Sequence, residues 1–335
     1  MANRVAIYTI ALQGVEMFEK ILVPLDGSDL AENALPRALW LAQQTEGKLI
    51  LLHIPAAQGS YYTGMEGLAM HNVYAQDVSR ESQYAAGQEY LNNIRYGLGR
   101  NYPDLQWEVR VESGDPASVI VDMAQEEGVD LIVMSTHGRS GISRWLLGSV
   151  TEKVLCQAPC PVLSVRSQET IEKVLVTLGG SELSETCLPA AFSLAAAFDA
   201  SVTLLRVYSD KDAPDFHQVH ELNAYEAGLG ARMARDVAER AAAYLENIRL
   251  QYEAVGVPVT TAVRYGSPAP VILEFSEEFG LDLIVMSTHG RTGLRRWAFG
   301  SVTAKVLRST NSDMLTIRPT AVEFKKGQEG FKWVK

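Results

Sequence analysis

The fold of this chain is decided by Met134-Ser-Thr-His-Gly138-Arg-Ser-Gly-Ile-Ser-Arg-Trp-Leu-Leu-Gly148-Ser-Val-Thr151, a segment that occurs twice. The second copy begins at Met286, 152 positions later (286 − 134), and ends with Gly300-Ser-Val-Thr303. In a chain of 335 residues, a long segment repeated at this distance predicts two domains with the same fold.

Each copy lies between an apolar run and a helical pattern. Leu131-Ile-Val133 and Leu283-Ile-Val285 predict strands that are buried on both faces. The Gly-Ser-Val-Thr at the end of each copy opens a helix, and the first amide groups of a helix have no partner within it. Glycine allows the backbone to approach a phosphate closely, and the two hydroxyls can cap the helix or bind a phosphate oxygen. This order of strand, loop and helix therefore predicts a loop that holds the phosphates of a nucleotide.

Composition and charge exclude several classes of protein. Apolar residues make up 47% of the chain and charged residues 21%, as in an ordinary globular protein. No apolar run approaches the roughly 20 residues that span a bilayer, and residues 1–16 make a poor secretion signal. The net charge of −10 argues against binding to nucleic acid or to a membrane surface. Three cysteines are too few for a disulfide scaffold, so we expect reduced cysteines in a cytoplasmic protein.

Strand and helix patterns alternate through both halves of the chain. Asp115-Pro116 and Ser267-Pro268 each predict a capping residue followed by proline at the first helical position. The alternation predicts an α/β fold with two domains, each a five-stranded parallel sheet with helices on both faces. The expected strands are 20–26, 48–54, 105–111, 130–135 and 162–165, then 173–178, 201–207, 283–285 and 313–317; the expected helices include 31–44, 77–98 and 151–157.

We expect the two domains to span residues 18–166 and 171–318, joined by a short linker. Residues 1–17 precede the first recognisable strand and form an N-terminal extension. Residues 319–335 have no counterpart in the other half and are expected to form a surface arm or a disordered tail. Pro55–Met70 predicts a long connection of the kind that often serves as a lid or a mobile loop.

The expected ligand position follows from the topology. In open α/β sheets, ligands bind beyond the carboxyl ends of the strands, where the strand order reverses. Asp26, at the end of the first strand, and the loop after the fourth strand both lie at that edge.

The repeated loop resembles the nucleotide-binding loop of the universal stress protein family, here in tandem form from about Phe18 to Arg318. Family members that bind nucleotide carry Gly-x2-Gly-x9-Gly-Ser/Thr. The matching segments are Ser135-x2-Gly138-x9-Gly148-Ser149 and Ser287-x2-Gly290-x9-Gly300-Ser301, with serine in place of the first glycine in both. The resemblance implies two Rossmann-like domains of the adenine nucleotide alpha hydrolase type. It also implies binding of ATP, ADP or AMP, which Mg²⁺ could accompany.

The resemblance also implies which residues of the first half bind nucleotide. Asp26 would hold the ribose, the residues before it would lie beside the base, and the backbone after the second strand would meet the adenine. The phosphates would lie on the repeated loop. The implied nucleotide-binding residues are Pro24, Leu25, Asp26, Ile54, Met134, Ser135, His137, Gly138, Arg139, Gly148, Ser149, Val150 and Thr151.

The second half departs from this set at one position, because Gly179 stands where Asp26 stands in the first half. Glycine cannot accept hydrogen bonds from the ribose hydroxyls, so we predict asymmetric occupancy in favour of the first half. The corresponding residues of the second half are Thr177, Leu178, Val207, Met286, Ser287, Gly290, Arg291, Gly300, Ser301, Val302 and Thr303.

Three functions remain open. The first is a stress sensor or regulator that binds adenine nucleotide and acts through an unidentified protein partner. The second is a slow ATPase, for which His137 is the only candidate base, although the pattern favours a structural, hydrogen-bonding histidine over one that contacts phosphate. The third is a nucleotide-free interaction or chaperone-like protein, which the serine replacements and Gly179 favour. The sequence predicts no set of catalytic residues and no set of metal ligands, and it lacks the Gly-x4-Gly-Lys-Ser/Thr loop of fast phosphoryl-transfer enzymes.

The resemblance also bears on assembly, because the family usually pairs two domains through their fifth strands. It implies that the two halves of this chain pair with each other, with Val162–Val165 and Leu315–Ile317 as the seam. Whether the chain forms a homodimer stays open.

Overall fold

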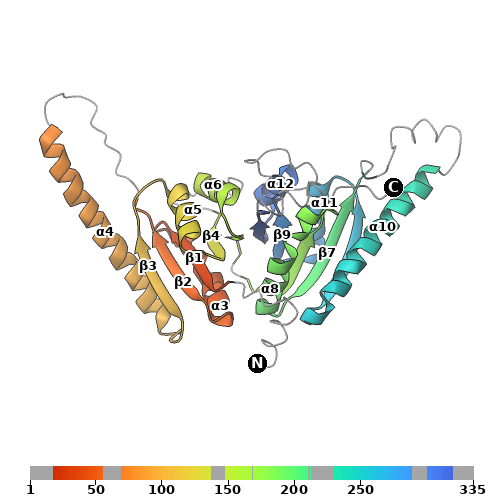
Figure 1. Ribbon diagram of the computed structural model, residues 1–335, viewed down its shortest axis with the longest axis horizontal. Coiled ribbons are helices and arrows are strands. Elements are labelled where there is room, and N and C mark those ends of the chain that lie inside the picture. The colour runs from red at the N-terminus through yellow and green to blue at the C-terminus, as the bar shows by residue number, and fades with distance from the viewer. Residues whose placement is uncertain are drawn as a thin grey trace. The chain divides into compact units, whose positions relative to one another are not determined.

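The computed structural model describes residues 18–55, 69–136, 148–167, 169–209, 212, 229–288 and 300–319. The chain divides into two compact units, the first from Phe18 to Val165 and the second beginning at Arg166. Figure 1 labels most of the helices and strands of these two domains.

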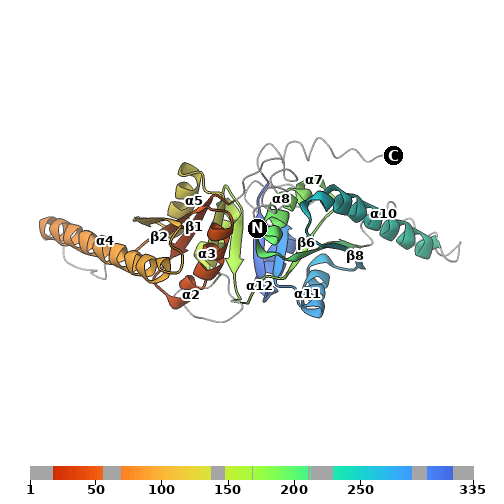
Figure 2. The same cartoon turned by 90° about the horizontal axis from the view of Figure 1, so that it is seen from below.

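The first domain is built on a parallel sheet with the strand order β3-β2-β1-β4-β5. Because connections between parallel strands are right-handed, the helices that follow β1 and β2 lie on one face and those that follow β3 and β4 on the other. Figure 2 shows α5 across the sheet from α3 and α4. The elements are β1 (Lys20–Leu25), α2 (Asp29–Glu32), α3 (Leu35–Gln44), β2 (Lys48–His53), α4 (Ala69–Gly99), β3 (Gln106–Val111), α5 (Pro116–Glu126), β4 (Leu131–Ser135), α6 (Ser149–Gln157) and β5 (Val162–Val165).

The second domain repeats this arrangement with the strand order β8-β7-β6-β9-β10, again with parallel pairing throughout. The predicted α/β class with parallel sheets is therefore confirmed in both halves. The elements are β6 (Lys173–Thr177), α7 (Glu182–Glu185), α8 (Leu188–Phe198), β7 (Ser201–Tyr208), α10 (Leu229–Gln251), the short 3₁₀ helix η2 (Glu253–Val255), β8 (Val259–Tyr265), α11 (Pro268–Phe279), β9 (Leu283–Ser287), α12 (Ser301–Ser309) and β10 (Asp313–Ile317).

The central strands form the core of each domain. The three apolar residues that begin β4, Leu131 to Val133, are fully buried, and so are the three that begin β9, Leu283 to Val285. A central strand covered by helices on both faces buries every side chain, and each such aliphatic side chain contributes about 1.5–3 kcal/mol. The prediction that these runs are buried on both faces is confirmed.

One detail of the predicted helices is wrong, and one helix start has the predicted residues without the expected hydrogen bond. The expected helix 31–44 is broken into α2 and α3, with Pro36 in the first turn of α3. Proline has no N–H to donate to the preceding turn, so one continuous helix cannot form across it. Asp115 caps α5 as predicted, since its carboxylate accepts from Ser118 N at 3.2 Å, whereas Ser267 stands at the N-cap of α11 without a side-chain hydrogen bond to it.

Several predictions fall outside the described residues. They concern the extension 1–17, most of the connection Pro55–Met70 and most of the tail 319–335. The helix α4 begins at Ala69, so the end of that connection is helical rather than part of a loop. The pairing of the two domains through their fifth strands stays a prediction.

Candidate functional site

The carboxyl ends of β1 and β4 define the candidate site of the first domain. β1 pairs with β2 along its whole length, up to Leu25↔His53, but its pairing with β4 is confined to Ile21↔Leu131 and Leu22↔Ile132. At the opposite ends of β1 and β4, the Asp130 carboxylate accepts a hydrogen bond of 2.9 Å from Lys20 N. The two strands are therefore joined at their amino ends and unpaired at their carboxyl ends, where strand order reverses and ligands of such sheets bind.

Asp26 follows β1 at this edge and is held in a fixed orientation by Ser28. Its Oδ1 accepts hydrogen bonds from Ser28 N at 3.0 Å and from Ser28 Oγ at 2.6 Å. Ser28 is also the N-cap of α2, where its Oγ accepts from Ala31 N at 3.2 Å. The intervening Gly27 has φ = 81°, a left-handed conformation that glycine adopts at little cost. The tight turn therefore fixes a half-buried carboxylate at the end of β1.

The start of α6 lies at the same edge, next to the end of β4, as Figure 1 shows. Gly148 N donates to Thr136 O at 3.2 Å, and Thr151 Oγ1 donates to Ser135 O at 3.4 Å, so the helix start is tied to the strand. Gly148 is the N-cap of α6 and brings no side-chain acceptor to the first turn. The amides of Ser149 and Val150 thus begin a helix without a side-chain cap, and the partial positive charge there favours an anion.

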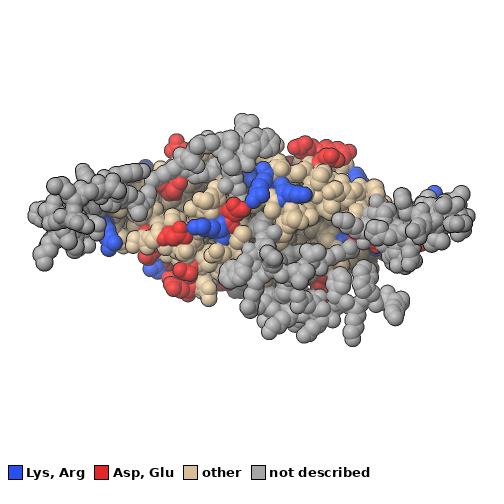
Figure 3. Space-filling view, turned by 90° about the horizontal axis from the view of Figure 1, so that it is seen from above, with Lys and Arg blue, Asp and Glu red and all other residues tan. Residues whose placement is uncertain are grey.

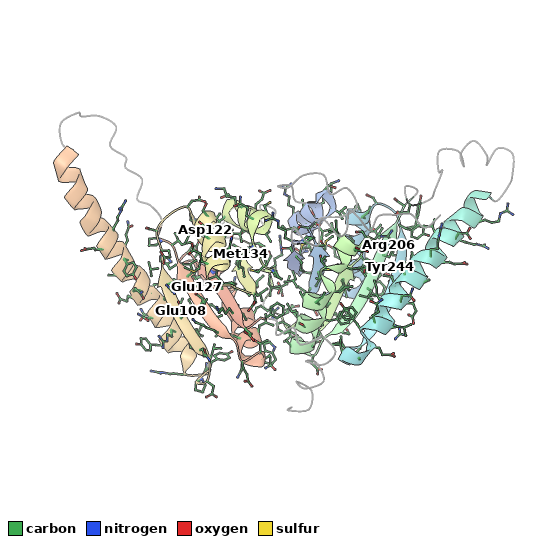
Figure 4. The ribbon with its side chains drawn as sticks, viewed as in Figure 1. Glu108, Asp122, Glu127, Met134, Arg206 and Tyr244 are labelled. Carbon is green, nitrogen blue, oxygen red and sulfur yellow. The ribbon has the colours of Figure 1, made fainter. Side chains whose placement is uncertain are left out.

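The structure brings most of the predicted residues of the first domain to this edge of the sheet. Pro24 and Leu25 end β1, Ile54 directly follows β2, and Met134 and Ser135 end β4. Figure 4 labels Met134, which is buried, on its strand. Gly148, Ser149, Val150 and Thr151 form the start of α6, with Ser149 exposed and Thr151 buried. Three of the predicted residues lie outside the described part of the chain: His137, Gly138 and Arg139.

The second domain repeats the ties between strand and helix. Gly300 N donates to Thr288 O at 2.8 Å, and Thr303 Oγ1 donates to Ser287 O at 3.0 Å. The space around the glycine differs, because a Cβ on Gly300 would lie 2.5 Å from Thr288 O, against 3.5 Å from Thr136 O for Gly148. Of the other predicted residues, Thr177 and Leu178 end or follow β6, Val207 lies in β7, Met286 in β9 and Ser301 and Val302 in α12, while Gly290 and Arg291 lie outside the described residues.

Two buried basic residues at this edge were not among the predicted site residues. His53 ends β2, and Arg206 stands at the same position of β7. Each contacts the backbone oxygen at the end of the neighbouring strand: His53 Nδ1 lies 2.8 Å from Leu25 O, and Arg206 Nη1 donates to Leu178 O at 3.3 Å. The sequence carries a signal for these two residues, because each half has a basic residue at the same place in an otherwise apolar second strand.

A second repeated pair joins the long helix of each domain to the helix after the first strand. Tyr90 of α4 donates to Glu32 Oε1 at 2.9 Å, and Tyr244 of α10 donates to Glu185 Oε1 at 2.8 Å. Burial, together with the charge of Glu185, raises the pKa of Tyr244 well above its ordinary value. The Tyr244 hydroxyl therefore keeps its proton at neutral pH and donates a hydrogen bond to Glu185.

The described residues show neither a metal-binding cluster nor a helix suited to a membrane. They contain no group of three or more His, Cys, Asp or Glu side chains that could hold a metal ion. None of their helices is long and apolar enough to cross a bilayer. On the face drawn in Figure 3, the described lysine and arginine side chains are interspersed with acidic and uncharged ones.

Comparison with known proteins decides the family. A sequence model of the universal stress protein family matches residues 17–166 and again residues 170–318. The chain belongs to the universal stress protein family. The two matches also confirm the tandem form that the repeated loop predicted.

Individual relatives of this universal stress protein agree with that assignment. The universal stress protein YxiE of Bacillus subtilis is 34% identical over 150 residues, which are 45% of this chain and 100% of YxiE. A universal stress protein of Methanothermobacter thermautotrophicus is 36% identical over 154 residues, 46% of this chain and 99% of its own length. Each of these relatives corresponds in length to about half of the chain.

A solved structure with similarity along most of the chain is a universal stress protein from Archaeoglobus fulgidus. It has a TM-score of 0.62 and 19% sequence identity, and the match covers 90% of this chain and 98% of that one. At this identity the likeness supports the fold alone. The assignment of individual nucleotide-binding residues stays a prediction.

Proposed function

We propose that the first domain binds an adenine nucleotide at the carboxyl ends of β1 and β4, and that the protein acts in a stress response as a nucleotide-dependent regulator of a protein partner. The observation that carries the proposal is the position of Asp26. Ser28 holds its carboxylate at the end of β1, and the uncapped first turn of α6 begins at the end of the neighbouring β4. One edge therefore offers both an acceptor for sugar hydroxyls and a helix start for phosphate oxygens.

The residues at this edge fit the parts of such a ligand. A ribose presents hydroxyl donors, which a carboxylate accepts strongly. Polyphosphate oxygens accept from backbone amides, and Ser149 at the helix start is exposed and adds a hydroxyl. Ile54, a buried residue directly after β2, continues the same edge toward the position proposed for the base. Mg²⁺, if it accompanies ATP, would be held mainly by the phosphates and water.

The test is equilibrium binding of ATP with Mg²⁺ to the full chain, with Asp26→Ala as the variant. A hydrogen bond to a charged group contributes about 1.5–3 kcal/mol, so we expect the affinity to fall by about ten- to a hundredfold. Asp29→Ala is the matched control, because it removes an exposed carboxylate from the same turn and the same charge from the chain. Equal affinities of the two variants would refute the role of Asp26. Absence of ATP binding by the unaltered chain would favour the nucleotide-free interaction protein.

The proposal is for a binding protein rather than an enzyme. A hydrolase needs a base within hydrogen-bond reach of the attacking water, and the proposal already assigns Asp26 to the sugar. The candidate base, His137, lies outside the described residues. We expect the same negligible release of phosphate from ATP by the unaltered chain and by His137→Ala. Measurable turnover that His137→Ala abolishes, with binding intact, would instead identify a slow ATPase.

A further inference from the structure

The second domain differs from the first in what its basic residue does at the end of the second strand. In the first domain, the His53 ring turns toward α4. It meets the Tyr90 ring edge-on at 5.3 Å between centroids, and a Cβ on Gly87 would lie 2.9 Å from its Cδ2. The imidazole is therefore packed beneath the long helix, beside the sheet.

Arg206 instead extends its guanidinium over the turn that follows β6. A Cβ on Gly180 would lie 2.7 Å from Arg206 Nη1, 2.8 Å from Cζ and 3.0 Å from Nη2. A side chain at position 180 would therefore have to displace the guanidinium, and glycine also suits the φ of 73° there. Figure 4 shows Arg206 next to Tyr244, between β7 and α10.

An acidic residue holds the guanidinium in this position. Arg206 Nη2 donates to Asp212 Oδ1 at 3.3 Å, and the two side chains are only 9% and 11% exposed. The other oxygen of Asp212 accepts from Ser209 N at 2.8 Å and from Ser209 Oγ at 3.3 Å. A buried ion pair persists only when further hydrogen bonds satisfy both partners, as they do here. The pair is therefore a built part of the fold rather than a surface contact.

The position of this ion pair matches the sugar side of the site proposed for the first domain. Gly179 and Gly180 correspond to Asp26 and Gly27, because β6 begins at Lys173 and β1 at Lys20 and both strands lead into the same turn. A Cβ on Gly179 would lie 3.7 Å from Ser184 Cβ and Oγ and 4.0 Å from Arg206 Nη1, all ordinary contacts. A carboxylate introduced at position 179 would therefore have the guanidinium within reach, and the guanidinium would compete with a ribose for it.

We propose that the buried Arg206–Asp212 ion pair fills the sugar side of the second site and thereby restricts adenine nucleotide to the first domain. The location of the site rests on the proposed function; the filling of the space by Arg206 does not. The missing carboxylate at Gly179 is then not the only obstacle. Restoring an aspartate at position 179 would not be sufficient for ATP to bind the second domain while the Arg206 guanidinium stays in place.

The experiment counts ATP sites on the full chain by equilibrium dialysis with Mg²⁺. Gly179→Asp alone is the matched control and is expected to bind as many ATP molecules as the unaltered chain. Gly179→Asp combined with Arg206→His and Asp212→Asn removes both charges of the pair together, and the first two substitutions copy Asp26 and His53 of the first domain. It is expected to bind one additional ATP per chain.

The outcomes separate this inference from the proposed function. An unaltered chain without ATP would contradict the proposed function, while an additional site in the triple variant would still support the ion pair as the obstacle. No additional site in a folded triple variant would overturn the inference. So would two ATP molecules on the unaltered chain, one of which survives Asp26→Ala.

A second measurement applies if the triple variant does not fold. Gly180→Ala is made in the unaltered chain and in Arg206→His, and the melting temperatures are compared. The strain of a positive φ is common to both pairs and cancels, so the difference reports the contact between the new methyl group and the guanidinium. We expect Gly180→Ala to lower the melting temperature by several degrees more in the presence of Arg206. Equal losses would show that the guanidinium does not cover Gly180, which overturns the proposal.

Discussion

Alanine substitution at two matching glycines, Gly148 and Gly300, is expected to have different effects on stability. Each glycine is the N-cap of its helix, with φ and ψ of −60° and 142° at Gly148 and −56° and 134° at Gly300, values that alanine adopts without strain. The difference lies in the space. A Cβ on Gly148 would lie 3.5 Å from Thr136 O, an ordinary contact, whereas a Cβ on Gly300 would lie 2.5 Å from Thr288 O.

The size of the effect follows from that overlap. A carbon rests against a carbonyl oxygen at about 3.3 Å, so Gly300→Ala must move the helix start or the strand end by roughly 0.8 Å. The hydrogen bond from Gly300 N to Thr288 O, now 2.8 Å, joins the same two segments. Its loss costs about 0.5–1.5 kcal/mol, and the crowding itself costs about 1–3 kcal/mol. We expect Gly300→Ala to destabilise its domain by about 2–4 kcal/mol.

Gly148→Ala lacks this cost and serves as the control. Alanine restricts the unfolded chain more than glycine does, which stabilises the Gly148→Ala variant by about 0.4–1 kcal/mol. Alanine is also a poorer N-cap residue than glycine, and this destabilises the variant by a similar amount. For a domain of this size, 1 kcal/mol moves the melting temperature by about 2–4 °C. Calorimetry of the full chain should therefore show a loss of about 4–16 °C for Gly300→Ala and little change for Gly148→Ala.

Hydrogen exchange measured by mass spectrometry assigns the effect to a domain. In Gly300→Ala, the amides of α12 should exchange faster while those of α6 keep their protection. Equal shifts of the two variants, or unchanged exchange in α12, would refute the steric argument. The Gly-Ser-Val-Thr starts of the two helices would then be equivalent in solution.

Three further predictions concern the site, the cysteines and the assembly. Ser28→Ala removes the cap of α2 and the hydrogen bond from the Ser28 hydroxyl to Asp26, so it should lower the free energy of unfolding by about 1 kcal/mol and weaken ATP binding several-fold. Ser181→Ala removes the matching cap in the second domain and should leave ATP binding unchanged. Burial raises the pKa of the Cys187 thiol to about 12, so at pH 8 roughly one such thiol in ten thousand is ionised. A disulfide reagent should therefore modify the less buried Cys156 first. Rapid labelling of Cys187 in the folded chain would contradict its burial. Separately produced halves, residues 18–166 and 171–318, should associate in sedimentation experiments if their fifth strands form a seam, and two monomeric halves would argue against a built-in pairing surface.

Much of the fold could be predicted because its signals are local. The strands at 162–165 and 313–317 have the predicted bounds, since each is a short apolar run between turn residues. Asp115 and Pro116 set the start of α5 through a side-chain acceptor and a preset φ. The break between α2 and α3 was also local and was missed, because the apolar spacing of 31–44 outweighed the missing N–H of Pro36.

The amino-acid sequence was sufficient to predict the repeated order of strands and helices, the edge of each sheet where the loops meet, and the lack of a carboxylate at Gly179. These features follow from periodicity, glycine and capping residues a few positions apart. How the space at that edge is filled became clear from the three-dimensional packing. Gly148 and Gly300 both begin Gly-Ser-Val-Thr, but a Cβ would fit at Gly148 and would clash at Gly300. Arg206 extends over Gly180 to Asp212, whereas the His53 ring packs beneath α4. Those outcomes depend on how neighbouring strands, turns and helices pack against one another, which no local pattern encodes.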